Sequence, residues 1–283
     1  MGINIKDNKN LKDDKELIYL LLIIFLVFGA YSGINLIKWS MDAKNTEKQI
    51  NEINTSTEVK EVNDTIDTII VNPPKEENKE NPYWDYIKMN LINVDFSKLK
   101  SINSDTVGWI KVNGTNINYP FVQTFDNTYY LKKDFNKKYN SAGWVFMDYR
   151  NSVKDFDKNT ILYAHGRVDG TMFGSLKNIT KSNWYNNSDN HVVKLSTEYE
   201  NTLWQVFSIY RIPETSDYLD IDFNNNEEYV KFLEMLQNRS EYKFDVSLNE
   251  EDKILTLSTC YKENDRVVLH AKLIKMEVRN GNN

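Results

Sequence analysis

Two β-type runs near the C-terminus carry residues suited to nucleophilic chemistry, where the first run ends and the second begins. The first, 254–260 (ILTLSTC), ends in the one cysteine of the chain, and the second, 266–274 (RVVLHAKLI), begins with an arginine. Five polar residues (YKEND) separate the runs, which predicts a hairpin. The end of one hairpin strand and the start of the next share an edge of the sheet, so Cys260 and Arg266 are expected to be neighbours at a solvent-facing rim.

A histidine closes a third strand-like run in the same way. His165 ends the run NTILYAH (159–165) and precedes a glycine. If this strand is aligned with the cysteine strand, a thiol, an imidazole and a guanidinium converge. A thiol with a pKa of about 8.5 is only a few per cent thiolate at neutral pH, and a neighbouring positive charge favours the thiolate. Histidine can protonate a leaving amine, and arginine presents a fixed fork of donors to an oxyanion or a substrate carbonyl.

Each of these residues also has an ordinary structural explanation. A lone cysteine is most often a small buried hydrophobe, and a lone histidine on a strand is usually structural. His191 and His270 sit within apolar strand patterns and fit that structural role better than His165. His270 lies on the cysteine hairpin and is the main rival for a catalytic role, but a strand rises about 3.3 Å per residue, so it is expected roughly 13 Å from the rim.

Composition excludes several classes of protein. Among 283 residues, 35 are Lys or Arg and 41 are Asp or Glu, a net charge of −6 without the basic patch of a nucleic-acid binder. A single cysteine excludes an internal disulfide framework and a multi-cysteine zinc or iron–sulfur site. The mean hydropathy of −0.60 excludes a multi-pass membrane protein. We expect no metal and no cofactor.

The N-terminal part predicts a membrane anchor. Residues 17–37 contain no charged side chain, and 21 helical residues rise about 31 Å, enough to cross the hydrocarbon core. A cleaved signal peptide is the alternative, because Ala30-Tyr31-Ser32 resembles a cleavage site, but the apolar run continues beyond it. A slight excess of lysines before the run places the N-terminus inside. We therefore expect a cytoplasmic tail (1–16), a single-pass transmembrane signal anchor (17–38) and an extracellular remainder.

Residues 39–82 are expected to form a polar stalk. Residues 40–82 include no aromatic residue but three of the five prolines, which is typical of a solvated spacer, with a helical piece near 46–54. From residue 83 onward aromatics return, and the expected extracellular catalytic domain spans 83–283. Expected helices are 82–91 and 227–239. Expected strands are 107–112, 117–122, 143–148, 160–165, 191–196, 202–212, 253–259 and 266–276. Many short strands and few helices predict a mainly β fold, a closed or nearly closed barrel with helical decoration.

Over residues 83–278 the chain resembles the sortases, and among them class B. The strings that carry the resemblance are VGWIKVNGTNINYPFVQTFDNTYYL (107–131), AGWVFMDYRN (142–151), ILYAHG (161–166), DGTMFGSL (169–176), TLSTC (256–260) and RVVLHAKLI (266–274). The resemblance implies an eight-stranded sortase-type β-barrel with N-terminal helices and a helix in the loop before the cysteine strand. It also implies a cysteine transpeptidase on the outer face of a Gram-positive cell membrane.

Such an enzyme cleaves a C-terminal sorting motif resembling N-P-x-T-[N/G] after the threonine, through a thioacyl intermediate. The expected partners are surface proteins with this signal and an amine of the peptidoglycan cross-bridge or stem peptide, with no nucleic acid. Carried over by motif position, Cys260 is the nucleophile, His165 the general acid/base, and Arg266 orients the substrate and stabilises the oxyanion. The substrate-binding residues implied are Asn127 and Leu131 in the groove wall, Ser258 beside the nucleophile, and Thr215 and Tyr218 in a lid formed by the loop and helix between the strands 202–212 and 253–259.

One departure and two alternatives qualify this expectation. The connection between Cys260 and Arg266 is shorter than the class leads us to expect, which should narrow or reposition one groove wall. A cell-surface cysteine peptidase or amidase would use the same thiol and imidazole but release its product to water. A non-enzymatic anchored β-domain would not need Cys260 at all. The TLSTC motif with its downstream arginine favours the sortase.

Overall fold

The computed structural model describes residues 5–74, 81–261 and 265–279, with side chains from residue 15 onward except at positions 260 and 261. It divides into two compact units, Met1–Asn45 and Thr46–Asn283. The helix α1 (Ile5–Ser56) runs through the first unit and into the second.

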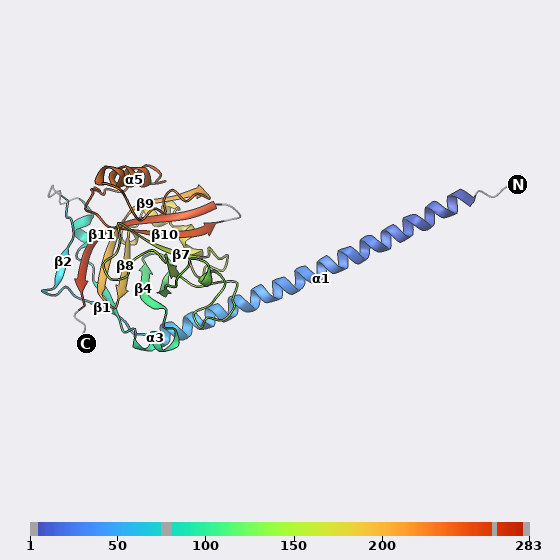
Figure 1. Ribbon diagram of the computed structural model, residues 1–283, viewed down its shortest axis with the longest axis horizontal. Helices are drawn as coiled ribbons and strands as arrows, with labels where there is room; N and C mark the ends of the chain where they lie inside the picture. Colours follow the sequence, from blue (N-terminus) through green and yellow to red (C-terminus); the bar gives the residue numbers. More distant parts are fainter. Residues whose placement is uncertain (1–4, 75–80, 262–264, 280–283) are drawn as a thin grey trace. The chain divides into compact units, whose positions relative to one another are not determined.

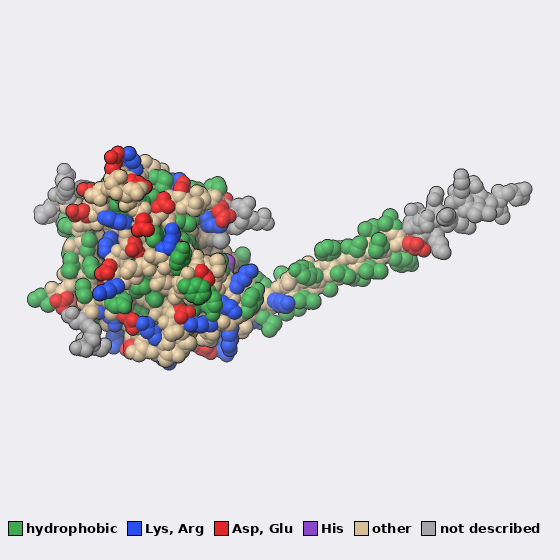
Figure 2. All heavy atoms as spheres, viewed as in Figure 1, with side chains coloured by type: hydrophobic (Ala, Val, Ile, Leu, Met, Phe, Trp, Pro, Cys, Tyr) green, Lys and Arg blue, Asp and Glu red, His purple; other side chains and the backbone are tan. Residues whose placement is uncertain are grey.

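The first unit is an apolar helix without a core of its own. The large hydrophobic side chains between Leu17 and Ile37 are exposed, and Figure 2 shows them along the helix. Within the described residues, α1 is the one helix long and apolar enough to cross a membrane. By length and composition this segment is suited to a membrane anchor.

The second unit is built on a barrel of eight strands (Figure 1). These are β4 (Thr106–Val112), β5 (Asn118–Val122), β6 (Phe146–Met147), β7 (Asn159–Ala164), β8 (Val192–Thr197), β9 (Glu200–Pro213), β10 (Ile254–Tyr261) and β11 (Asp265–Val278). The order around the barrel is β10-β7-β6-β5-β4-β8-β9-β11, and β11 pairs with β10 to close it. The pairs β10–β7 and β5–β6 are parallel and the others are antiparallel. The predicted eight-stranded barrel is confirmed.

The strand boundaries differ from prediction mainly in length. The expected strand 143–148 pairs only over β6, whereas 202–212 extends to the fourteen residues of β9. The helix expected over 82–91 is only α2 (Tyr83–Tyr86), and the chain then enters a strand, β3 (Leu91–Val94). The remaining short helices are α3 (Ser97–Ile102), α4 (Ser182–Tyr185) and the 3₁₀ turns η1 (Tyr129–Leu131), η2 (Gly174–Asn178) and η3 (Ser188–Asn190).

The helix α5 (Asn226–Asn238) covers the outside of the barrel. It begins where the side chain of Asn225 accepts a hydrogen bond from the backbone N–H of Glu228, which satisfies a free donor of the first turn. Its apolar face packs on the outward residues of β9, β10 and β11. Those contacts come from Tyr229, Phe232, Leu233 and Leu236. The central residues of β9 and β11 are therefore buried on both faces.

Part of the expected polar stalk packs against the barrel unit. Ile53 is buried in the main core, and β1 (Val59–Val62) pairs antiparallel with β3. A second strand, β2 (Thr68–Ile70), pairs with the end of β11. The structure thus differs from a freely solvated spacer over 46–74. β-branched residues occur within this otherwise polar stretch, and free strand edges provide partners for its backbone.

A buried lysine links this segment to the barrel. The Lys275 ammonium on β11 is fully buried and donates to the carboxylate of Asp64 at 2.6 Å. It also donates to the backbone carbonyls of Ile87 and Met89, both at 2.7 Å. A buried charge must be paired and hydrogen-bonded, so the segment before β2 supplies the charge that β11 needs.

Glu200 at the start of β9 is expected to make the stability of the barrel depend on pH. The residue is 5% exposed, and its Oε1 has no hydrogen-bond partner among the described residues. Burial raises the pKa of Glu200 to about 7, from an ordinary value of 4.5. The folded state therefore binds this proton more tightly than the unfolded state, so stability falls as pH rises from 4.5 to about 7.

We expect Glu200→Gln to raise the melting temperature by a few degrees at pH 8, since about 1 kcal/mol shifts it by roughly 2–4 °C in a domain of this size. At pH 4.5 the gain should be much smaller, because Glu200 is then protonated. Calorimetric scans at both pH values measure the difference. The exposed Glu198, two residues earlier, is the matched control, and Glu198→Gln should change little at either pH. Equal gains for Glu200→Gln at pH 4.5 and pH 8 would contradict this assignment.

Candidate active site

The register of three adjacent strands places the three predicted residues together. Cys260 on β10 is paired with Arg266 on β11 across the antiparallel hairpin. On its other side β10 runs parallel to β7, and the last pair is Thr259 with Ala164. Cys260 and His165 each follow directly after that pair. The hairpin and the shared rim expected from the sequence are therefore found, with the backbone of Cys260 between the strand that ends at His165 and the strand that carries Arg266.

A hydrogen bond to a backbone carbonyl orients the imidazole of His165. Its Nε2 lies 2.8 Å from the carbonyl oxygen of Leu131, which closes the turn η1. A carbonyl oxygen can only accept, so Nε2 carries the proton. Nδ1 is then the nitrogen left to exchange a proton with a reacting group. The bond to Leu131 thus sets both the tautomer and the orientation of the ring.

The guanidinium of Arg266 is mostly buried and already engaged by an acid. Its side chain is 17% exposed, and Nη2 lies 2.5 Å from Oε1 of Glu214. Nη1 donates to the carbonyl of Asp265 at 3.2 Å. The Glu214 side chain is 63% exposed, so solvent weakens the pair, and an incoming carbonyl or oxyanion can compete for the same fork of donors.

A groove of about 570 Å³ opens at this rim. Seven of the eight residues expected at the site line it: Asn127, Leu131, His165, Thr215, Tyr218, Ser258 and Arg266. The eighth is Cys260, whose side chain lies outside the described residues. Residues 262–264 also lie outside the described residues. The predicted effect of the short connection on the groove wall therefore stays a prediction.

Tyr218 lies deeper than a lid residue would. Its side chain is buried, and its hydroxyl is 2.8 Å from Oγ of Ser258, two residues before the cysteine. This bond connects the segment after β9 to the cysteine strand. Residues 214–216, 218 and 219 of that segment line the groove, whereas α5 packs on the outer face of the barrel. Of the segment expected to form a lid, the loop lines the groove and the helix does not, because the apolar face of α5 packs on β9, β10 and β11.

Several groove residues were not predicted. Tyr163 lies two residues before His165 on β7, so both side chains point to the same face, and this period of two was a usable signal. Phe146, Glu214, Ser216 and Leu219 also line the groove. Nothing in the local sequence of these four distinguishes them from ordinary strand and loop residues.

The other two histidines have structural partners. His270 is fully buried, with Nδ1 2.8 Å from the Thr256 hydroxyl and Nε2 2.8 Å from the Tyr210 hydroxyl. Burial lowers the pKa of His270 to about 3. His191 lies 3.2 Å from the Tyr86 hydroxyl and 2.8 Å from the Tyr185 carbonyl, and burial lowers its pKa as well. Neither histidine lines the groove, so His165 is the imidazole at the rim.

Comparison with known proteins identifies the family of this barrel. Residues 110–274 match the sortase domain family. The sortase B of Staphylococcus aureus is 39% identical over 185 residues, which cover 64% of this chain and 75% of the relative. A solved S. aureus sortase B–substrate complex is 38% identical with a TM-score of 0.60, and the match covers 64% of this chain and 84% of that one. A sortase B from Bacillus anthracis in complex with AAEK1 is 34% identical with a TM-score of 0.65, over 83% and 99% of the two chains. The chain belongs to the sortase family, and within it to the class B transpeptidases.

Proposed function

We propose that this transpeptidase cleaves a C-terminal sorting motif of the N-P-x-T-[N/G] type after the threonine and joins the protein to a peptidoglycan amine. The observation that carries the proposal is the strand register, which sets Cys260 opposite Arg266 and one residue beyond the pair that precedes His165. A nucleophile, a general acid/base and a fixed cation at one groove are what acyl transfer to an amine requires.

In the first half-reaction Nδ1 of His165 accepts the proton of the Cys260 thiol as the sulfur attacks the threonine carbonyl carbon. A C–S bond forms, the carbonyl oxygen becomes an oxyanion, and the Arg266 guanidinium turns from Glu214 to that oxygen. The tetrahedral intermediate collapses as the C–N bond breaks. The leaving amine takes a proton from Nδ1 of His165, while Nε2 keeps its bond to Leu131. The product is a thioacyl enzyme.

In the second half-reaction an amine of the cell wall attacks the thioester carbonyl. The nitrogen forms the new amide bond, its proton passes to His165, and Cys260 leaves as the thiolate. Asn127 and Leu131 on one wall and Thr215, Tyr218 and Ser258 on the other bind the sorting motif in the groove. Its apolar lining residues, among them Phe146 and Leu219, suit the proline and the residues around it.

The domain arrangement follows from this function. Residues 1–16 form a cytoplasmic tail, 17–38 the transmembrane signal anchor, 39–82 the connection to the barrel, and 83–283 the extracellular catalytic domain. The groove then meets secreted proteins that carry the sorting signal on the side of the membrane where the peptidoglycan lies. The uncharged run within α1 and its exposed apolar side chains support the anchor.

The decisive experiment separates transfer from hydrolysis. The full chain in detergent is incubated with a fluorogenic sorting peptide, with and without triglycine or a diamino-acid stem peptide, and the products are identified by mass spectrometry. We expect an amide adduct whose share rises with amine concentration at the expense of the free acid. Cleavage that yields only free acid with every cell-wall amine would make the protein a peptidase and end the transfer proposal.

A further inference from the structure

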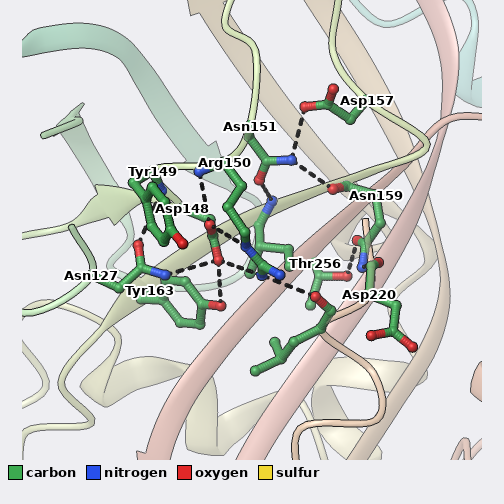
Figure 3. Close-up of polar contacts among 12 residues, drawn as sticks. Asn127, Asp148, Tyr149, Arg150, Asn151, Asp157, Asn159, Tyr163, Asp220 and Thr256 are labelled. Carbon is green, nitrogen blue, oxygen red and sulfur yellow. Dashed lines mark hydrogen bonds and ion pairs between the residues drawn. The ribbon is translucent and has the colours of Figure 1, made fainter. Parts of the chain in front are cut away.

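A buried carboxylate beside the groove gathers contacts from three separate segments. Asp148, directly after β6, has a fully buried side chain. Its Oδ2 accepts from Asn127 Nδ2 at 3.0 Å, from the Tyr163 hydroxyl at 2.9 Å and from Arg150 Nη2 at 2.8 Å. Its Oδ1 accepts from Nε of Arg150 at 2.9 Å and from the backbone N–H of Arg150 at 3.0 Å. Figure 3 shows this convergence. Asn127 and Tyr163 both line the groove.

The same arginine also reaches a loop that lines the groove. Nη2 of Arg150 also donates to the backbone carbonyl of Leu219 at 3.0 Å. The side-chain amide of Asn159 donates to the carbonyls on either side, Tyr218 at 3.1 Å and Asp220 at 2.9 Å. Three consecutive carbonyls are thus held by two side chains. We refer to residues 214–220 as the lid loop.

The two holding side chains are themselves fixed. Asn159 Oδ1 accepts from the Thr256 hydroxyl at 2.6 Å, so the cysteine strand orients the amide. Arg150 is fixed by Asp148. Burial acts to raise the pKa of Asp148, but the hydrogen bonds from Arg150 and Tyr163 outweigh it and lower that pKa, so the carboxylate is charged at neutral pH. A charged carboxylate buried here must keep its arginine.

Other side chains of the lid loop also bond to described parts of the chain. Asp217 pairs with Arg239 at the end of α5, the Tyr218 hydroxyl meets Ser258, and Glu214 meets Arg266. The last two lie within the groove itself. Arg150 and Asn159 therefore hold the loop backbone from beside the groove, and a shift of their bonds would move Tyr218 and Leu219 relative to Asn127 and Tyr163.

We propose that Asp148, Arg150 and Asn159 are positioning residues that hold the lid loop over the groove and thereby set the affinity for the sorting peptide. The inference rests on the proposed function, because it explains how the loop is held so that the groove fits the sorting peptide. The guanidinium of Arg150 is required because a single group must donate hydrogen bonds to the Asp148 carboxylate and to the Leu219 carbonyl at the same time. A lysine ammonium is a point charge without that fixed fork.

The test compares Arg150→Lys with the wild type in two measurements. The KM for the sorting peptide should rise about tenfold while kcat changes by less than about threefold, since one hydrogen bond of about 1.4 kcal/mol corresponds to a factor of ten. In a Cys260→Ala background, the Kd for a fluorescent sorting peptide should rise by the same factor. The rate of Cys260 alkylation by iodoacetamide, measured in the chain that keeps the thiol, should not change.

Arg279→Lys is the matched control. Like Arg150, Arg279 donates to backbone carbonyls, in this case those of Val94 and Thr197, at the other end of β11 from Arg266. It should leave both KM and Kd unaltered. Arg150 is 36% exposed, so its variant is expected to fold, and Asn159→Ser provides a second, independent loss of two lid contacts.

The outcomes are distinguishable. Suppose that Arg150→Lys and Asn159→Ser keep the wild-type KM and Kd and only the melting temperature falls. These residues would then have a structural role alone, and the proposal would be overturned. A fall in kcat without a change in KM would overturn it too. If the wild-type chain itself forms no amine adduct, the proposed function fails, and the Kd measurement still decides whether the lid loop controls peptide binding.

Discussion

Cys260→Ala is expected to lower cleavage and transfer of a sorting peptide by at least about 10⁴-fold, the scale seen when the nucleophile of a comparable hydrolase is removed. The chain has no second cysteine that could substitute. Mass spectrometry under single turnover should show a thioacyl adduct on the wild type and none on the variant. Peptide binding should persist, which would show that the groove is intact. Turnover that survives in Cys260→Ala would remove the thiol from the mechanism.

His165→Ala should lose activity to a similar extent, and a second variant makes that result specific. His165→Gln keeps a side-chain N–H able to reach the Leu131 carbonyl but has no nitrogen that titrates near neutral pH. If His165 acts as acid and base, both variants are inactive. Substantial activity in His165→Gln alone would mean that the residue serves only to anchor Leu131.

The rim of the site could be predicted because a hairpin is local. Five residues between two β runs fix which ends meet, and the observed pairing of Cys260 with Arg266 follows from that. The sequence could not establish that His165 lies beside Cys260. The two residues are 95 positions apart, and no local rule sets the register between their strands. The parallel pairing of Thr259 with Ala164 supplies it. The family resemblance predicts that His165 and Cys260 lie together, because members of a family share the same tertiary arrangement.

Contacts between distant polar residues could not be predicted. From sequence alone, Lys275 is indistinguishable from an ordinary lysine on a strand. Its acidic partner Asp64 lies 211 residues earlier, in a stretch whose composition predicts a solvated segment. In the same way, Asp148 and Arg150 have the spacing of an unremarkable surface pair. Their importance arises from Asn127, Tyr163 and Leu219, which come from three other parts of the chain.

Arg266→Lys is expected to lower kcat/KM by about 10²–10³-fold, the range found when one oxyanion donor is removed. Glu214 and the Asp265 carbonyl hold the guanidinium at the rim before substrate arrives, and the oxyanion then takes the place of Glu214. Lysine keeps the charge but loses the planar fork. Steady-state rates with the fluorogenic peptide measure the loss. Arg211→Lys is the control, because Arg211 is exposed on β9 outside the groove and should change the rate by no more than about a factor of two.

The pH dependence of thiol alkylation separates the two roles open to this arginine. If Arg266 acts only on the oxyanion, Arg266→Lys should leave the apparent pKa of the Cys260 thiol close to that of the wild type. Turnover should then collapse while alkylation at each pH stays close to that of the wild type. A loss of turnover that parallels an upward shift of the thiol pKa would assign Arg266 to thiolate stabilisation instead. Near-normal turnover would contradict both roles and leave the guanidinium as the structural partner of Glu214.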